Sequence, residues 1–192
     1  RMTDLAADTP PVRDGQIKRH GPEGFEGMRR AGRLSAETLD LLVDIVKPGV
    51  TTRDIDDFVR NHFLKNGAVP ATLGYRGYPA SSCTSINHVV CHGIPGAPIP
   101  KSSSETISRD LEKRRKDDVL RDGDILNIDV TVIVDGWFGD TSRMYVAGEA
   151  PKKAKDLIQV THDALMLGIE AVKPGNTFGD IGHAIQSHVE AT

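Results

Sequence analysis

ILNIDVTVIVDGWFGDTSRMY, residues 125–145, is the stretch that decides the fold of this chain. Its first half is mostly apolar or β-branched, which is typical of a strand. Asp135 and Gly136 follow, and this dipeptide is a favoured two-residue turn between antiparallel strands. If these two residues form the loop, Val134 pairs with Trp137, and the register of a β-hairpin is fixed over the whole stretch.

Two aspartates come together on one face of this predicted hairpin. Continuing the register places Thr131 opposite Asp140 and Asp129 opposite Ser142. Because side chains alternate between the two faces along a strand, Asp129 and Asp140 are diagonal neighbours, with Cα atoms roughly 7–8 Å apart or less. Asn127 shares their face. The opposite face is apolar and consists of Leu126, Ile128, Val130 and Val132.

Two carboxylates this close in a partly buried sheet repel each other, and three outcomes are physically available. One carboxylate takes a proton, a basic side chain pairs with them, or a cation lies between them. A further interpretation is a solvent-facing polar stripe on a half-exposed antiparallel sheet. The hairpin by itself therefore does not name a reaction.

The composition of the chain excludes several classes of protein. The 192 residues are 38% hydrophobic and 27% charged, with a net charge of −3, which does not indicate a nucleic-acid or membrane surface. No apolar run approaches the roughly 18–20 residues that span a bilayer, and residues 1–20 lack the apolar core of a signal peptide. Cys83 and Cys91 could pair, but reduced thiols in a cytoplasmic protein are the simpler interpretation.

Helical periodicity predicts two helices before the hairpin. Residues 1–20 are expected to be a flexible lead-in to one domain that spans residues 21–192. A long helix is predicted over about 22–46, ended by Lys-Pro-Gly, and Thr51 or Thr52 caps a second helix over about 53–66. The predicted buried stripes are Phe25, Met28, Ala31, Leu34, Thr38, Leu41, Leu42 and Ile45 in the first helix, and Ile55, Phe58, Val59 and Phe63 in the second.

The chain then repeats itself. VKPGVTTRDI at 46–55 matches VKPGNTFGDI at 172–181, at a constant offset of 126 residues. Each copy predicts a long helix, a Lys-Pro-Gly stop and a Thr-capped second helix, so we expect two structurally related halves. The second copy reaches Thr192 within its second helix, and we expect the chain to be cut where its second set of strands would begin. The stripe predicted for the long helix over 151–172 is Ala154, Leu157, Ile158, Thr161, Leu165 and Ile169.

Two segments between the helices and the hairpin differ in character. Residues 68–95 combine β character with many glycines and prolines, which predicts an irregular path held by a scaffold, where functional residues often lie. Residues 96–121 are rich in Pro and Ser and then densely charged (SRDLEKRRKDD). We expect this insertion to be a solvated excursion, with a partner-binding loop as the alternative.

Several of these segments together resemble the type I methionine aminopeptidases of the bacterial, cytosolic kind. The segments are GYRGYP (74–79), CTSIN (83–87), VVCHGIP (89–95), DGDILNIDVTVIVDGWFGDTSRMY (122–145) and the two KPG junctions. The resemblance lapses only at 96–121, where the family has a shorter connection. It implies the pita-bread fold, an α/β (α+β) architecture of two pseudo-symmetric halves around a curved antiparallel sheet, with helices outside and the site on the inner face.

The resemblance also implies an activity, the removal of the initiator methionine from nascent proteins when the second residue is small. Family members bind two divalent metal ions (cobalt, manganese, iron or zinc). Such ions, about 3.5–4 Å apart, lower the pKa of a shared water, polarise the scissile carbonyl and stabilise the developing oxyanion. The implied partner is a nascent N-terminus close to the ribosome. The protein is expected to act as a cytoplasmic monomer without membrane or nucleic-acid binding.

The resemblance assigns roles to individual residues. Asp129 and Asp140 correspond to the two aspartates among five metal-ligating side chains, with Asp140 bridging both ions. His92 corresponds to the catalytic histidine, which hydrogen-bonds the substrate and helps to stabilise the tetrahedral intermediate. The methionine pocket would be lined by Tyr75, Tyr78, Cys83 and Thr72, the last at a position where many bacterial members have cysteine. A monovalent cation would be held by the backbone carbonyls of Asn87 and Val89.

The family's other three ligands, one His and two Glu, lie in the second half, which would follow Thr192. We therefore expect the 192-residue chain alone to have an incomplete site and negligible turnover. Five other histidines are not expected to be metal ligands, because they lie in the lead-in or on predicted helices. They are His20, His62, His162, His183 and His188. His88 is a weak candidate next to Asn87.

Two alternative functions remain open. A non-catalytic module of the same fold could bind ribosomes or nascent chains, although such a module has no need of Asp129, Asp140 and His92. Another pita-bread peptidase such as a prolidase is also possible, and the pocket residues Tyr75, Tyr78 and Cys83 favour methionine instead.

Overall fold

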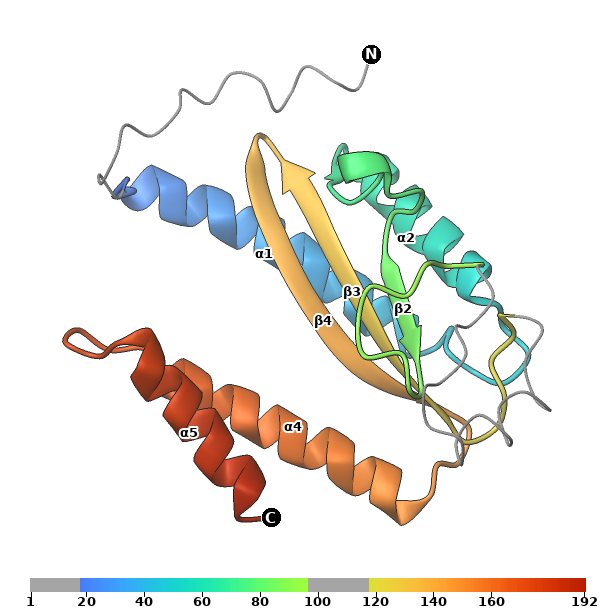
Figure 1. Ribbon diagram of the computed structural model, residues 1–192. Coiled ribbons are helices and arrows are strands. Elements are labelled where there is room, and N and C mark those ends of the chain that lie inside the picture. Colours follow the sequence, from blue (N-terminus) through green and yellow to red (C-terminus); the bar gives the residue numbers. More distant parts are fainter. Residues whose placement is uncertain (1–17, 97–117) are drawn as a thin grey trace.

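A computed structural model describes residues 18–96 and 118–192 of the chain. The first half contains α1 (Pro22–Leu42), α2 (Thr52–Lys65), β1 (Val69–Pro70), the 3-10 helix η1 (Tyr75–Gly77), β2 (Cys83–Ile86), β3 (Asp124–Val134) and β4 (Trp137–Ala147). Two further helices follow, α4 (Lys152–Glu170) and α5 (Phe178–Glu190) (Figure 1). The predicted lead-in lies outside the described residues up to position 17, and so does most of the insertion predicted at 96–121.

The predicted hairpin is confirmed residue by residue. Val134 pairs with Trp137, and the register continues through Thr131↔Asp140 to Asp129↔Ser142. Asp135 and Gly136 have φ values of 49° and 81°. Two consecutive positive φ values define the type I′ turn that matches the twist of a hairpin. Burial alternates along β3 as the pattern predicts, with Leu126, Ile128, Val130 and Val132 fully buried.

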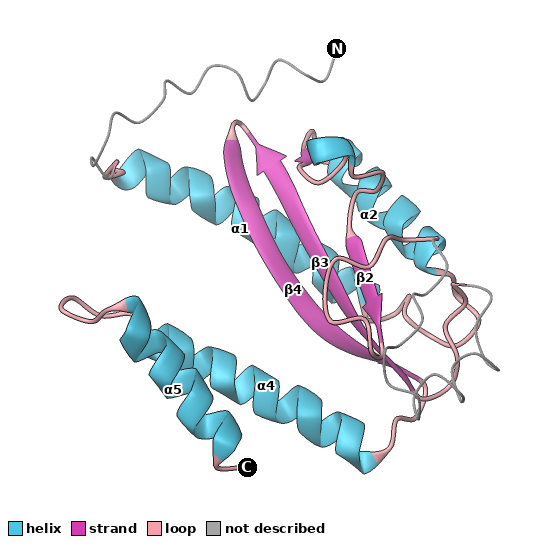
Figure 2. Cartoon of the chain, viewed as in Figure 1, coloured by secondary structure: helices cyan, strands magenta, loops and turns pink. Residues whose placement is uncertain are grey.

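β3 is the central strand of one antiparallel sheet. β4 pairs along one edge, while β2 (opposite residues 126–129) and β1 (opposite residues 132–133) share the other edge. α1 and α2 pack on one face of this sheet, and the segment that follows β2 lies over the other face (Figures 1 and 2). Each large side chain fully buried between helices and sheet contributes about 1.5–3 kcal/mol. The largest of these are Phe63, Leu39, Leu42, Ile55, Leu120, Leu126 and Ile128.

The buried face of α1 differs from the predicted stripe. Phe25, Met28 and Leu41 are 58%, 50% and 46% exposed. Small residues take their place, because α1 comes very close to β4: a Cβ added to Gly27 would lie 2.4 Å from the Trp137 ring. The buried residues of the helix are Gly24, Gly27, Ala31, Ser35, Thr38, Leu39 and Leu42.

α1 also ends earlier than predicted, at Leu42. The N–H groups of Val43 and Ile45 bond to carbonyls three residues back rather than four, which tightens the last turn before the Lys-Pro-Gly stop. The second helix agrees with the prediction. Thr51 is its N-cap, and the helix buries Ile55, Val59 and Phe63, with Phe58 partly buried.

The repeat is present in the backbone conformation as well as in the amino-acid sequence. Gly49 and Gly175 both have φ +94°, a conformation that favours glycine. A capping box begins each second helix, formed by Thr51 with Asp54 and by Thr177 with Asp180. Gly49 and Gly175 are 126 residues apart, which is the offset found in the sequence. The two threonines and the two aspartates of the capping boxes have the same offset.

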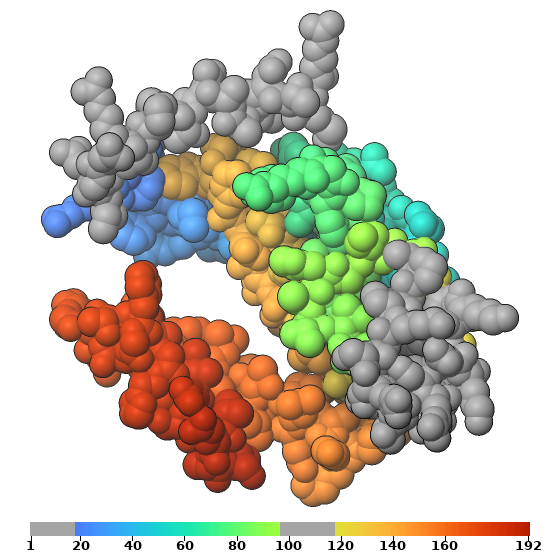
Figure 3. Space-filling view, in the orientation of Figure 1, coloured from blue at the N-terminus to red at the C-terminus, as the bar shows by residue number. Residues whose placement is uncertain are grey.

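The buried face of α4 was not predicted correctly. Leu157, Leu165 and Ile169 are 59%, 54% and 54% exposed, whereas Ala164 and Gly168 are buried. The reason is that α4 packs mainly on α5, with Ile185 against Gly168, and not on the sheet. In the space-filling view the two helices stand off from α1 and the strands (Figure 3).

The described ends of the insertion meet at the N-terminus of α2. The Gly96 N–H donates to the Thr52 hydroxyl at 2.9 Å, and the Asp118 carboxylate accepts from Thr52 Oγ1 and from the Arg53 N–H. The inserted segment thus leaves and returns at one place on the scaffold. Among the helices that the structure describes, none has the length and apolar character that crossing a membrane requires.

Candidate functional site

Asp129 and Asp140 lie on the sheet face opposite α1 and α2. Burial raises the pKa of Asp129 above its ordinary value, and the neighbouring Asp140 carboxylate raises it further. Within the described part of the chain, no Lys or Arg forms a salt bridge with either group. Asp129 is half-buried and Asp140 is exposed, so the pair is only partly in contact with solvent. Without a Lys or Arg partner, the outcomes available to the pair are a bound proton, a bound cation or a pairing with a nearby histidine.

His92 is close enough to Asp129 for its charge to lower the pKa of that carboxyl. The segment that carries His92 runs beside β2: the Thr84 N–H donates to the Gly93 carbonyl at 2.8 Å, and the Gly93 N–H donates to Ser85 Oγ at 3.1 Å. A Cβ on Gly93 would lie 2.1 Å from the Thr84 carbonyl oxygen, so only glycine allows this approach. His92 itself has φ 54°, a strained value held by these contacts.

Tyr78 and Cys83 lie in the same neighbourhood. Cys83 is the register partner of Asp129 and is buried. The Tyr78 hydroxyl lies 3.1 Å from the carbonyl oxygens of both Ser82 and Gly93. Burial raises the pKa of Tyr78 and of the Cys83 thiol, and the Asp129 charge adds to both effects. Both groups are therefore neutral at neutral pH, which suits the binding of a polarisable apolar group.

The remaining predicted residues lie around this centre. Thr72 Oγ1 donates to the Ala80 carbonyl at 3.0 Å. Tyr75 is 65% exposed, with the Arg76 guanidinium 5.6 Å from its ring centre. Asn87 has φ 51° and fixes the end of β2: its amide donates to Asp124 Oδ1 at 2.9 Å and its side-chain oxygen accepts from the Ile125 N–H. The Val89 N–H donates to Ile86 O in the same turn.

Other histidines have structural contacts of their own. His20 packs edge-on against Trp137, His62 stacks on Phe58, and His162 lies 3.5 Å from the Asp163 carboxylate. His183 and His188 lie on α5. Within residues 18–96 and 118–192, no group of three or more His, Cys, Asp or Glu side chains could hold a metal ion. Among these residues, Asp129 and Asp140 thus have no third His, Cys, Asp or Glu beside them that could complete a metal site.

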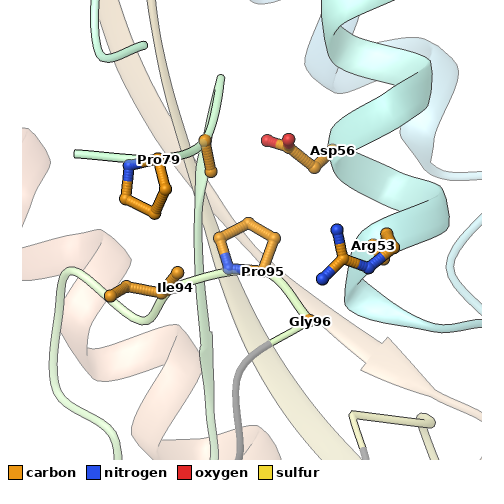
Figure 4. A pocket seen from close by; sticks show the side chains of 7 residues that line it. Arg53, Asp56, Pro79, Ile94, Pro95 and Gly96 are labelled. Atoms are coloured by element: carbon orange, nitrogen blue, oxygen red, sulfur yellow. The ribbon is translucent and has the colours of Figure 1, made fainter. Parts of the chain in front are cut away.

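One residue near the site carries no signal in the sequence. Asp56 on α2 accepts three hydrogen bonds from Ser81 and Ser82, the residues that lead into β2. It also lines a cavity of about 190 Å³ (Figure 4). The other lining residues are Arg53, Pro79, Ala80, Ile94, Pro95 and Gly96. The sequence shows only one acidic residue among several on a polar helix surface, because its partners are 25 and 26 positions away.

Comparisons with known proteins agree with this geometry. Residues 26–192 match the sequence profile of Metallopeptidase family M24. Methionine aminopeptidase of Rickettsia prowazekii (strain Madrid E) is 53% identical over 174 residues, covering 91% of this chain and 60% of that protein. The Escherichia coli (strain K12) methionine aminopeptidase is 46% identical, covering 88% and 58%. The chain thus spans about three fifths of the length of these curated relatives.

Solved structures show the same fold. The crystal structure of methionine aminopeptidase from Rickettsia prowazekii superposes with a TM-score of 0.79 at 52% identity, covering 92% of this chain and 63% of that one. X-Pro aminopeptidase from Thermotoga maritima shares the fold alone, at 16% identity and a TM-score of 0.67, covering 90% and 42%. The predicted pita-bread fold is confirmed. The chain therefore belongs to metallopeptidase family M24, and over most of its length it is similar to the methionine aminopeptidases.

Proposed function

We propose that the whole protein removes the N-terminal initiator methionine from nascent proteins whose second residue is small. The observation that carries this proposal is the Asp129–Asp140 pair, which lies beside His92 and has no described Lys or Arg as its partner. The neutral, half-buried Tyr78 and the neutral, buried Cys83 next to it support a pocket for a thioether side chain. The names of the relatives support methionine as the residue removed.

Divalent metal ions fit the residues in part. Two neighbouring carboxylates without a Lys or Arg partner are hard oxygen ligands, and the pKa of Asp129 is raised by burial and by the Asp140 charge, both of which a bound cation would offset. We propose that Asp140 would contact two metal ions (cobalt, manganese, iron or zinc) and Asp129 one of them, in a set completed by one His and two Glu. When bound, such ions lower the pKa of a water molecule and polarise a carbonyl.

The other residues of the chain would bind and orient the substrate. His92 would hydrogen-bond the substrate near the scissile carbonyl, because the Gly93 contacts with β2 fix its position. Tyr78, Cys83, Thr72 and Tyr75 would enclose the methionine side chain. Asn87 and Val89 would offer backbone carbonyls to a monovalent cation at the end of β2. The proposed partner is a nascent N-terminus in the cytoplasm, near the ribosome, with the protein acting as a monomer.

Peptide cleavage by the whole protein tests this function. The protein is freed of metal with a chelator, then restored with Mn²⁺ or Co²⁺, and methionine release is measured from Met-Ala-Ser and Met-Phe-Ser. We expect release only after restoration and only from the peptide with the small second residue. His92→Ala should lower kcat by roughly 100-fold or more, the usual loss for a positioned polar catalytic group. Equal cleavage of both peptides, or full activity in the chelator, would contradict the proposal.

For the 192-residue chain by itself we propose negligible turnover. Calorimetric titration with Mn²⁺ should show far weaker binding than a five-ligand site gives, because the described residues supply only two adjacent carboxylates. Robust methionine release by this chain alone would refute the expectation of an incomplete site.

A further inference from the structure

Asp56 connects α2 to the segment that enters the site. One of its oxygens, Oδ1, accepts from the Ser81 N–H at 2.9 Å, the Ser82 N–H at 2.8 Å and the Ser82 hydroxyl at 2.7 Å. α2 is packed firmly in the core, since Ile55 and Val59 on either side of Asp56 are fully buried. A rigid helix therefore holds two consecutive backbone N–H groups just before Cys83.

The same segment is linked onward to His92. The Tyr78 hydroxyl lies 3.1 Å from the Ser82 carbonyl and 3.1 Å from the Gly93 carbonyl. Gly93 is the next residue after His92, and its carbonyl also accepts from the Thr84 N–H. A continuous set of contacts thus runs from Asp56 through Ser82 and Tyr78 to Gly93, the residue next to His92.

Besides the Asp56 contacts, the hydrogen bond from the Gly96 N–H to Thr52 Oγ1 joins the end of the following loop to α2. The cavity of about 190 Å³ lies between Asp56 and the loops at Pro79-Ala80 and Ile94-Pro95 (Figure 4). Because side chains do not fill this space, the Pro79-Ala80 loop has room to shift toward the helix if the carboxylate contacts are lost. A displacement of about 1 Å at a site that must align reacting groups costs up to about 100-fold in rate.

We propose that Asp56 is a positioning residue of the site: its carboxylate oxygen fixes the 78–83 segment and, through Tyr78, the backbone that carries His92. This inference rests on the proposed methionine-releasing function. It assigns Asp56 no contact with the substrate or the metal. What it requires is an acceptor oxygen at this place, not a negative charge.

The acceptor requirement makes the inference testable with matched variants of the whole protein. Asp56→Asn keeps an acceptor oxygen and loses the charge, whereas Asp56→Ala loses both. Asp57→Ala removes the neighbouring acidic side chain, which is exposed and forms no hydrogen bond or salt bridge with the described residues, and serves as the control. Ser82→Ala is a milder change that removes one of the three bonds, and it remains informative if Asp56→Ala does not fold.

Kinetics on Met-Ala-Ser and norleucine-Ala-Ser is the first readout. We expect Asp56→Ala to lower kcat/KM per folded molecule roughly 10- to 100-fold and to change the ratio between the two substrates, because the pocket residues shift. Asp56→Asn and Asp57→Ala should behave like wild type, and Ser82→Ala should lie between. An Asp56→Ala variant that loses stability but keeps kcat/KM and the substrate ratio would overturn the inference. An Asp56→Asn variant as impaired as Asp56→Ala would overturn it too.

Hydrogen exchange provides a readout that does not depend on activity. Peptides covering residues 78–95 should exchange faster in Asp56→Ala than in wild type, Asp56→Asn and Asp57→Ala, with the helices unchanged. If the wild-type protein releases no methionine, the proposed function fails while this measurement still tests the positioning role. Unchanged exchange over 78–95 in Asp56→Ala would overturn the positioning role whatever the activity.

Discussion

Asp56 is a carboxylate whose environment opposes its charge. Burial raises its pKa, the three hydrogen bonds from Ser81 and Ser82 lower it, and the charge of Asp57 raises it, with an increase as the net effect. A carboxyl group whose pKa is higher in the folded state than in the unfolded state favours folding most when it is protonated. Its contribution is therefore fully present below the unfolded pKa and is lost as the pH rises through the raised folded value.

Asp56→Asn should therefore change how stability depends on pH. Because the asparagine keeps the acceptor without the buried charge, we expect the melting temperature at pH 7 to equal or exceed that of wild type. Below the raised pKa wild type is neutral at this position too, and the difference should vanish. Thermal unfolding at pH 7 and at a pH below the ordinary carboxyl pKa of 3.8 measures this. A variant clearly less stable than wild type at pH 7 would show that the charged form is the stabilising one.

Some residues of the candidate site could be predicted from the sequence and others could not. Asp129 and Asp140 could be found because carboxylates interrupt a strand that is otherwise apolar, and the turn fixes their relative register. His92 and Cys83 could be found only through their resemblance to family motifs. Asp56 could not be found, because its role depends on where the loop at 81–82 passes, and that path is set by tertiary contacts.

The contacts between helices and strands differ in how well the sequence predicts them. The hairpin could be predicted to the residue, since a period of two and an Asp-Gly turn leave one register. The face of α1 could not, because Gly24 and Gly27 contribute nothing to a hydrophobic pattern although they form the contact with Trp137. A helix can approach a strand closely only where its residues lack large side chains, so glycine positions matter as much as apolar ones.

Two alanine substitutions on α1 should have opposite effects. Gly27→Ala places a Cβ 2.4 Å from the Trp137 ring and should destabilise the protein by about 1–3 kcal/mol through overpacking. Gly32→Ala, on the same helix, meets nothing within 4 Å and should stabilise it by about 0.5–1 kcal/mol through helix propensity. Urea unfolding of both variants measures the difference. Equal effects would mean that α1 does not approach β4 as closely as the structure shows.

The two halves of the molecule differ in what covers their helices. α1 and α2 pack on the hairpin, while α4 and α5 repeat the same capping boxes and glycine turns but pack mainly on each other. Large apolar side chains are consequently exposed on this second pair and its connection, including Phe178 on α5 at 94% and Val172 between the helices at 67%. The repeat in the sequence predicted the helices, but periodicity alone could not show which of their faces would be covered.

Exposed apolar surface of this extent should affect the behaviour of the 192-residue chain in solution. We expect it to self-associate as its concentration rises, since apolar patches of this kind drive association. Replacing Leu165 and Ile169 with lysine should reduce the association without lowering the melting temperature, because both side chains are more than half exposed. Sedimentation velocity over a concentration series measures this. A monomeric chain at all concentrations would contradict the expectation.

The carboxylate pair is the centre of the proposed function, and one measurement tests it most directly. Methionine release from Met-Ala-Ser by the whole protein with Mn²⁺ is compared among wild type, Asp140→Ala and the acidic control Asp57→Ala. We predict that Asp57→Ala retains wild-type turnover and that Asp140→Ala loses at least about 100-fold, more than the loss of a residue that only supports a metal ligand. Wild-type turnover in Asp140→Ala, with the same dependence on metal, would contradict the role proposed for the pair.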